Sequence, residues 1–236
     1  MAKLRCALQG GSQPHEPSSP HLTRLTRADL SNERFRWLMG REIEVAGKLV
    51  RALRVSLVGE LGWELHAPMA ALPALYDALR EAGETFGIED FGTAALNAMR
   101  FEKAFMGTRE LNGTSSLVET GMMHFAKLDK GEFIGRDALR RKAASAPAAR
   151  CVHLDVDAGD SDCHGAEGVF SEGRLVGAVS SGAFGPSVQR SLAFAFVESN
   201  CAGVGEGLEV MVLGELRRAR VLGGATYDAA NQRVRM

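Results

Sequence analysis

The stretch Arg54-Val-Ser-Leu-Val-Gly-Glu-Leu-Gly-Trp-Glu-Leu-His66 sets two acidic residues and two glycines among apolar residues. A plain hairpin favours neutral turn residues, so the carboxylates require another explanation. Side chains alternate faces along a strand, so Trp63 and Leu65 can pack into a core while Glu64 points to the opposite face with His66. A carboxylate on a rigid strand, beside a close approach permitted by glycine, can pair with the N–H edge of a flat heterocycle. The alternative is a surface strand with solvated glutamates.

The residues around this stretch predict a mixture of strands and helices. Strands are expected over 43–66, with one run that continues to Val58 before the chain turns back. Apolar residues recurring every three or four positions predict amphipathic helices over 70–83 and 90–105, and a short helix over 21–32.

The pattern changes after the Ala- and Pro-rich break at 143–149. Short strands separated by glycine turns then predict a small antiparallel barrel or sandwich. The expected fold class is α+β, with a flexible Pro-rich leader at 1–21, an α+β portion at 22–147 and a β portion at 148–236. The expected strands are 151–156, 168–170, 175–180, 192–197, 208–213 and 219–222.

Composition and charge exclude several classes of function. The net charge of -1 gives no electrostatic reason to expect nucleic acid or an anionic membrane surface. No apolar run approaches the roughly 20 residues of a membrane span. The four scattered cysteines favour a reducing, cytoplasmic setting without disulfides. The spacing of His153, Cys163 and His164 matches no zinc pattern, so no metal site is expected.

Several sequence words together carry a family resemblance. The words Arg54 to His66, Ala-Leu-Asn-Ala-Met-Arg-Phe-Glu-Lys (95–103) and Lys-Leu-Asp-Lys-Gly-Glu-Phe-Ile-Gly-Arg-Asp-Ala-Leu (127–139) resemble the aminomethyltransferase family. This family includes the glycine-cleavage T-protein and the C-terminal folate module of dimethylglycine and sarcosine dehydrogenases. The likeness is greatest to the dehydrogenase-associated branch, whose strand reads Tyr-Val-Gly-Glu-Leu-Gly-Trp-Glu. A fourth word, Ala178 to Ser187, resembles the family's C-terminal barrel.

The resemblance implies a folate-binding domain followed by a small antiparallel barrel, with tetrahydrofolate as the cofactor. It implies that Glu64 pairs with the pterin, an interaction that is directional and costly to lose when buried. Leu57 stands where relatives carry a tyrosine, and Phe105 stands where the dehydrogenase branch carries one. Both are expected to form apolar walls of the folate site.

The chain also departs from the family pattern. The family's N-terminal segment, with an aspartate that assists one-carbon transfer, has no recognisable counterpart before Leu22, and Asp29 belongs to a different family word. No catalytic residue is therefore assigned, and the chain is expected to be a partial member. His124 replaces an expected tryptophan, and an ordinary, partly exposed histidine is the alternative interpretation.

Two classes of function remain open at this point. The first is a tetrahydrofolate-binding, aminomethyltransferase-like protein that handles a methylene or methyl unit from a small amine donor. The second is a non-catalytic folate-binding regulatory protein, or an interaction module of a larger oxidoreductase. The regulatory branch of the family carries a Lys-Gly-Cys-Tyr word, whose cysteine is lacking in Lys130 to Asp137. A second copy of the chain or a partner chain is expected to cover apolar surface.

Overall fold

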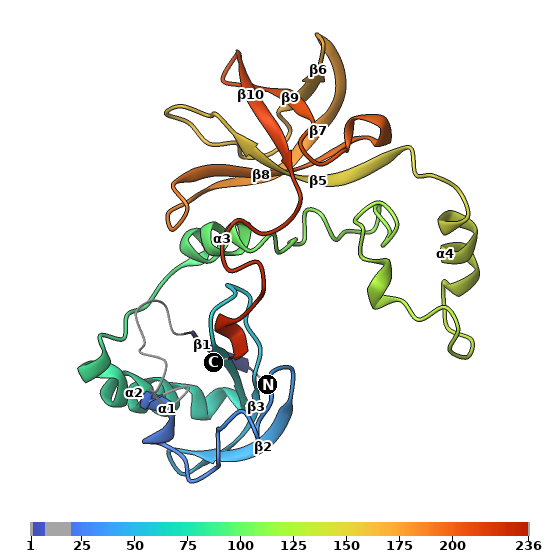
Figure 1. The fold of residues 1–236 in the computed structure, drawn as a ribbon. Coiled ribbons are helices and arrows are strands. Elements are labelled where there is room, and N and C mark those ends of the chain that lie inside the picture. Colours follow the sequence, from blue (N-terminus) through green and yellow to red (C-terminus); the bar gives the residue numbers. More distant parts are fainter. Residues whose placement is uncertain (1, 8–19, 236) are drawn as a thin grey trace. The chain divides into compact units, whose positions relative to one another are not determined.

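The computed structural model describes residues 2–7 and 20–235, and the chain forms two compact units (Figure 1). Unit 1 takes Met1–Leu96 together with Asp228–Met236, and unit 2 takes Asn97–Tyr227. Unit 1 is therefore built from two stretches that are far apart in the sequence.

A four-stranded antiparallel sheet with the order β1-β4-β3-β2 forms the centre of unit 1. Its strands are β1 (Ala2–Ala7), β2 (Gly40–Val45), β3 (Lys48–Leu53) and β4 (Gly62–Ala67). Strand β4 lies inside the sheet, where Glu64 pairs in register with Arg5 of β1 and with Leu53 of β3. Backbone pairing on both sides fixes the position of this strand.

The core of unit 1 lies between the sheet and helix α2 (Leu72–Gly83). Helix α2 contributes Leu75 and Leu79, which follow the spacing of an amphipathic helix. Trp63 and Leu65 of β4 are almost fully buried, which confirms the alternation expected for this strand. The Trp63 ring meets Phe35 edge-on, with 4.7 Å between the ring centroids. The short helices of unit 1 are α1 (Pro20–Thr23), η1 (Met69–Ala71), η2 (Glu84–Phe86) and η5 (Arg233–Arg235).

Unit 2 contains a closed six-stranded antiparallel barrel with the order β10-β5-β8-β7-β6-β9. Closure of the sheet pairs every strand on both sides and leaves no edge. Valines, leucines and alanines on alternating positions fill its interior. The strands are β5 (Ala149–Val156), β6 (Gly168–Ser171), β7 (Arg174–Gly185), β8 (Arg190–Glu198), β9 (Gly207–Val212) and β10 (Glu215–Leu222), and η4 (Ser199–Cys201) follows β8.

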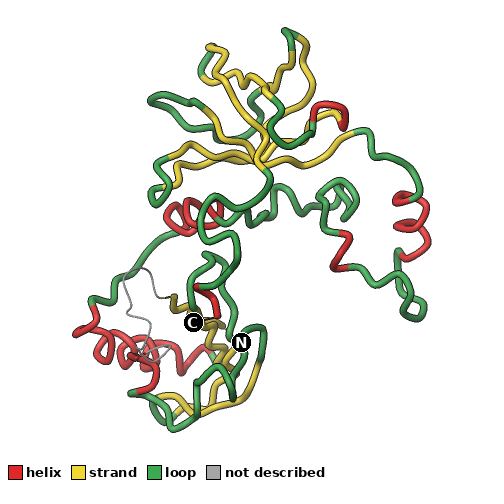
Figure 2. Tube along the Cα trace, viewed as in Figure 1, coloured by secondary structure: helices red, strands yellow, loops and turns green. Residues whose placement is uncertain are grey.

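Helix α3 (Thr93–Glu102) spans the division at residue 96, and a long connection then leads to α4 (Arg136–Ala143). Figure 2 shows this connection mainly as loop, apart from the short helix η3 (Met123–Phe125). Side chains therefore have to hold this segment in place, because a loop lacks the regular backbone hydrogen bonds of helices and sheets.

The mixed architecture with a small antiparallel barrel confirms the expected α+β class. Three predicted elements are shorter than expected. The helix predicted over 90–105 is limited to Thr93–Glu102. The helix predicted over 21–32 is limited to α1, because the Thr26 hydroxyl and the Asp29 carboxylate accept hydrogen bonds from backbone N–H groups two residues ahead, which favours turns. The strand predicted to continue to Val58 ends at Leu53, and the segment after it bends.

Strand β1 was not anticipated, because it lies inside the segment expected to be a leader. Residues 8–19 of that leader fall outside the described part of the chain. The boundary near residue 147 stays a prediction.

Candidate functional site

Glu64 lies on the face of β4 that is turned away from the core. Its neighbours Trp63 and Leu65 are buried, whereas Glu64 and His66 share the opposite face and are half-buried. The Nε2 of His66 lies 3.2 Å from the Oε2 of Glu64, and 15% of the Glu64 side chain remains exposed. The site therefore offers a rigidly mounted carboxylate that solvent reaches, which fits a ligand with an N–H edge.

Glu60, the other acidic residue of the quoted stretch, has a different environment. Only 6% of its side chain is exposed, and its Oε2 accepts a hydrogen bond of 2.6 Å from the Nε of Arg233. Asp228 accepts hydrogen bonds from the backbone N–H groups of Gln232 and Arg233, which stabilises the turn that carries Arg233. Glu60 is thus a structural anchor of unit 1.

The loop between β3 and β4 carries Leu57, the predicted apolar wall. Leu57 is 39% exposed, and the turn after it is closed by a hydrogen bond from the Gly59 N–H to the Ser56 hydroxyl at 3.0 Å. Gly59 has a φ of 81°, a conformation that favours glycine. Glu64 and Leu57 both belong to unit 1, whereas Phe105 belongs to unit 2, where it is half-buried.

A buried polar cluster in unit 2 holds the segment that carries Phe105. Glu110 is fully buried and accepts hydrogen bonds from the Ser180 hydroxyl at 2.6 Å, from the Ser181 hydroxyl, and from the Gly107 N–H at 2.7 Å. Arg100 completes the cluster, with its Nη1 3.6 Å from the Oε2 of Glu110. Burial lowers the pKa of Arg100 and the Glu110 charge opposes this effect.

The end of α3 is anchored through Glu102, which is 2% exposed. Its Oε1 accepts a hydrogen bond of 2.6 Å from the Ser187 N–H, and its backbone carbonyl accepts from the N–H groups of Thr226 and Tyr227. The helix is thereby fixed to the β7–β8 turn and to the segment after β10.

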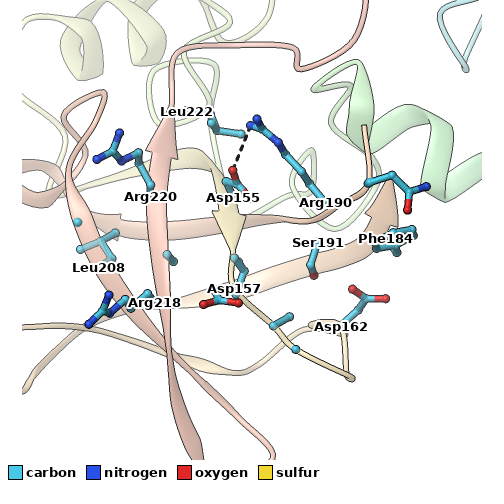
Figure 3. A pocket seen from close by; sticks show the side chains of 16 residues that line it. Asp155, Asp157, Asp162, Phe184, Arg190, Ser191, Leu208, Arg218, Arg220 and Leu222 are labelled. Atoms are coloured by element: carbon cyan, nitrogen blue, oxygen red, sulfur yellow. Dashed lines mark hydrogen bonds and ion pairs between the residues drawn. The ribbon is translucent and has the colours of Figure 1, made fainter. Parts of the chain in front are cut away.

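A hollow of about 920 Å³ lies on the barrel among β5, β8 and β10 (Figure 3). Charges of both signs line it, and Asp155 forms an ion pair of 3.1 Å with Arg190. The Oγ of Ser191 is buried there without a hydrogen-bond partner. None of the predicted site residues lines this hollow.

The Arg100–Glu110 cluster and the Glu60–Arg233 pair were not predicted from the sequence. Helix 90–105 was expected to have one apolar and one solvated side, but Arg100, Glu102 and Lys103 are all buried. The available signal was the word Arg-Phe-Glu-Lys, in which three charged residues surround a phenylalanine. If the phenylalanine is buried, the neighbouring charges are buried with it, and buried charges need partners from elsewhere in the chain.

Neither a metal cluster nor a membrane-spanning helix is present in residues 2–7 and 20–235. No group of three or more His, Cys, Asp or Glu there could hold a metal ion. In the same ranges, no helix is both long and apolar enough to cross a bilayer.

Two family models match the chain in sequence order. Residues 16–130 match the model described as GCVT N-terminal domain, and residues 150–228 match the glycine cleavage T-protein C-terminal barrel domain.

Similar proteins include dehydrogenases and aminomethyltransferases. The chain is 41% identical over 196 residues to human mitochondrial dimethylglycine dehydrogenase. The aligned region covers 82% of this chain and 23% of the dehydrogenase. It is 33% identical over 216 residues to 4-methylaminobutanoate oxidase (formaldehyde-forming) of Paenarthrobacter nicotinovorans, and the aligned region covers 91% of this chain and 26% of the oxidase. It is 28% identical over 208 residues to an aminomethyltransferase of Desulfitobacterium hafniense, and the aligned region covers 87% of this chain and 56% of the aminomethyltransferase. The chain thus spans about a quarter of the dehydrogenase and the oxidase, and about half of the aminomethyltransferase.

A solved structure shows the same fold. The glycine cleavage system aminomethyltransferase T of Bartonella henselae superposes with a TM-score of 0.72 at 21% sequence identity. The match covers 79% of this chain and 51% of that chain.

Proposed function

Because the chain belongs to the glycine-cleavage T-protein family, we propose that it binds tetrahydrofolate and takes part in one-carbon transfer from a small amine. The observation that supports this proposal most directly is the half-buried carboxylate of Glu64 on β4, which keeps 15% of its side chain exposed. A carboxylate in that position can accept two adjacent N–H donors of a pterin, which are directional contacts.

Leu57 and Phe105 are proposed as apolar walls of the same site. Leu57 provides apolar contact without a hydroxyl, and Phe105 can stack on a ring. Bound tetrahydrofolate would supply the amine nitrogens that accept a one-carbon unit. The part of this chain is to bind and orient the reactants, since proximity alone lowers a barrier substantially.

Titration of tetrahydrofolate by calorimetry tests the proposal. Loss of one charged hydrogen-bond partner costs roughly 1.5 to 3 kcal/mol, so Glu64→Gln should weaken binding about 10- to 150-fold. Glu44→Gln is the matched control, because Glu44 is an exposed residue on β2 of the same sheet. Equal affinities for wild type and Glu64→Gln would remove Glu64 from the site. Absence of binding to the wild type would reject the folate proposal.

A second candidate is a non-catalytic role as an interaction module of an oxidoreductase. The 41% identity to dimethylglycine dehydrogenase over only 23% of that protein favours it. Folate binding without any one-carbon transfer from amines to the folate, measured by product analysis, would support this candidate over the first.

We also propose that the protein associates with a second copy of itself or with a partner chain, and that it is located in the cytoplasm. Ile134 and Phe125 in unit 2 are exposed at 104% and 68%, so a partner chain that covered them would remove large apolar side chains from water. A strictly monomeric protein over a wide concentration range in light scattering, with no co-purifying chain, would contradict the association.

A further inference from the structure

The backbone of Phe105 is held by Arg100 from both sides of the residue. The Phe105 N–H donates to the Arg100 carbonyl at 2.9 Å, and the Phe105 carbonyl accepts from the Arg100 Nη1 at 2.9 Å. The preceding residue, Ala104, has a φ of 52°, in the left-handed region that residues with a side chain rarely adopt. Such a conformation persists only where the surroundings enforce it.

Arg100 is itself fixed by its remaining donors. Its Nε donates to the Asn97 Oδ1 at 2.8 Å, and its Nη2 donates to the Ser181 hydroxyl at 3.4 Å. Only 7% of the residue is exposed. A planar guanidinium that is bound along several edges cannot turn without breaking several hydrogen bonds.

Glu110 connects this arrangement to the barrel wall. Its carboxylate accepts from Ser180 and Ser181 of β7 and from the N–H of Gly107, only two residues after Phe105. Gly107 also lies against the guanidinium, since a Cβ at this position would come within 3.1 Å of the Arg100 Cζ. The segment around Phe105 is therefore fixed between α3 and β7.

We infer that Arg100 and Glu110 are positioning residues that set the direction of the Phe105 ring for stacking on a flat heterocyclic ligand. This inference rests on the proposed function, because it takes Phe105 as part of the folate site. Neither residue has to touch the ligand. Their effect on affinity passes through Phe105.

A double-mutant cycle tests this route. Glu110→Gln keeps the shape of the side chain but removes its charge and one acceptor, and should weaken tetrahydrofolate binding about tenfold. In a Phe105→Ala background, the same substitution should change affinity less than twofold, because the ring it positions is gone. If Glu110→Gln weakened binding by the same factor in the wild-type and Phe105→Ala backgrounds, the inference would be overturned, since a merely structural role of Glu110 does not depend on the Phe105 ring.

Hydrogen exchange gives a second measurement that needs no ligand. In Glu110→Gln, the amides of Phe105 and Gly107 should exchange at least tenfold faster than in the wild type. The matched control is Glu198→Gln, which removes the exposed Arg174–Glu198 ion pair of the same unit and should leave both amides unchanged. Unchanged exchange in Glu110→Gln would overturn the inference.

The two measurements separate this inference from the proposed function. If the wild type binds no tetrahydrofolate, the proposed function fails, and exchange at Phe105 still decides whether the cluster fixes this backbone. If Glu110→Gln does not fold, Ser180→Ala removes a single donor to the same carboxylate and the cycle is repeated with it.

Discussion

The Nε of Arg233 donates a hydrogen bond of 2.6 Å to the Oε2 of Glu60, a residue 173 positions earlier in the chain. This contact joins the C-terminal stretch of unit 1 to the loop that precedes β4. Because the Glu60 side chain is only 6% exposed, water cannot readily replace the guanidinium.

Arg233→Met should lower the free energy of unfolding of unit 1 by about 1.5 to 3 kcal/mol, because it takes a charged donor from a buried carboxylate. Both tryptophans of the chain, Trp37 and Trp63, lie in unit 1, so tryptophan fluorescence during urea unfolding reports on this unit. Arg51→Met, which breaks the exposed pair with Glu42, should cost no more than about 0.5 kcal/mol. Equal losses for the two variants would contradict the structural role of Arg233.

Gly177→Ala should destabilise the barrel by about 2 kcal/mol or more. A Cβ at Gly177 would lie 2.1 Å from the backbone oxygen of Phe196, on the strand that pairs with it, and backbone cannot yield as a side chain can. Gly203→Ala in the same unit has no atom within 4 Å of its added Cβ and should be nearly neutral. Thermal unfolding followed by circular dichroism compares the two variants, and similar midpoints would contradict the packing at Gly177.

Glu119 should make stability fall in acid. Burial acts to raise its pKa, but the Lys142 ammonium at 2.7 Å and hydrogen bonds from Ser116 outweigh burial and hold the pKa at about 2. A depressed folded-state pKa contributes stability above the ordinary value of 4.5, and this contribution is lost as the pH falls toward 2. Glu119→Gln should therefore flatten the decline between about pH 5 and pH 2, measured by urea unfolding at each pH. Parallel curves for Glu119→Gln and wild type would contradict this assignment.

Cys151 and Cys163 should resist alkylation in the folded protein. Burial, with smaller contributions from nearby carboxylates, raises the pKa of both thiols to about 12. At pH 8 only roughly one thiol in ten thousand would be ionised, and the thiolate is the reactive form. Iodoacetamide labelling followed by peptide mass spectrometry should modify both cysteines rapidly in urea and slowly in buffer. Rapid labelling of either in buffer would disprove the burial of that thiol.

The parts of the fold that sequence predicts are those set by local periodicity. Alternation along β4 placed Trp63 and Leu65 in the core and Glu64 on the other face, and the structure agrees. Short alternating runs with glycine turns likewise predicted the barrel, because each strand carries its own pattern of inward and outward residues.

The parts that sequence did not predict depend on partners remote in the chain. Glu110 and Ser180 are 70 residues apart, and no local pattern relates a carboxylate to a hydroxyl at that separation. The end of α3 looked like an ordinary amphipathic helix, but the partners of Arg100 and Glu102 come from loops and from the barrel. Side chains that satisfy one another across such separations are recognised only in three dimensions.

The discontinuity of unit 1 also sets an order of events during synthesis. Residues 97–227 leave the ribosome before Asp228, so the barrel strands can pair while the first 96 residues still lack Arg233. Glu60 must then stay without this guanidinium until residue 233 has been made, after the whole of the barrel. Unit 1 therefore reaches its final stability after the barrel does, although most of its sequence precedes that of the barrel.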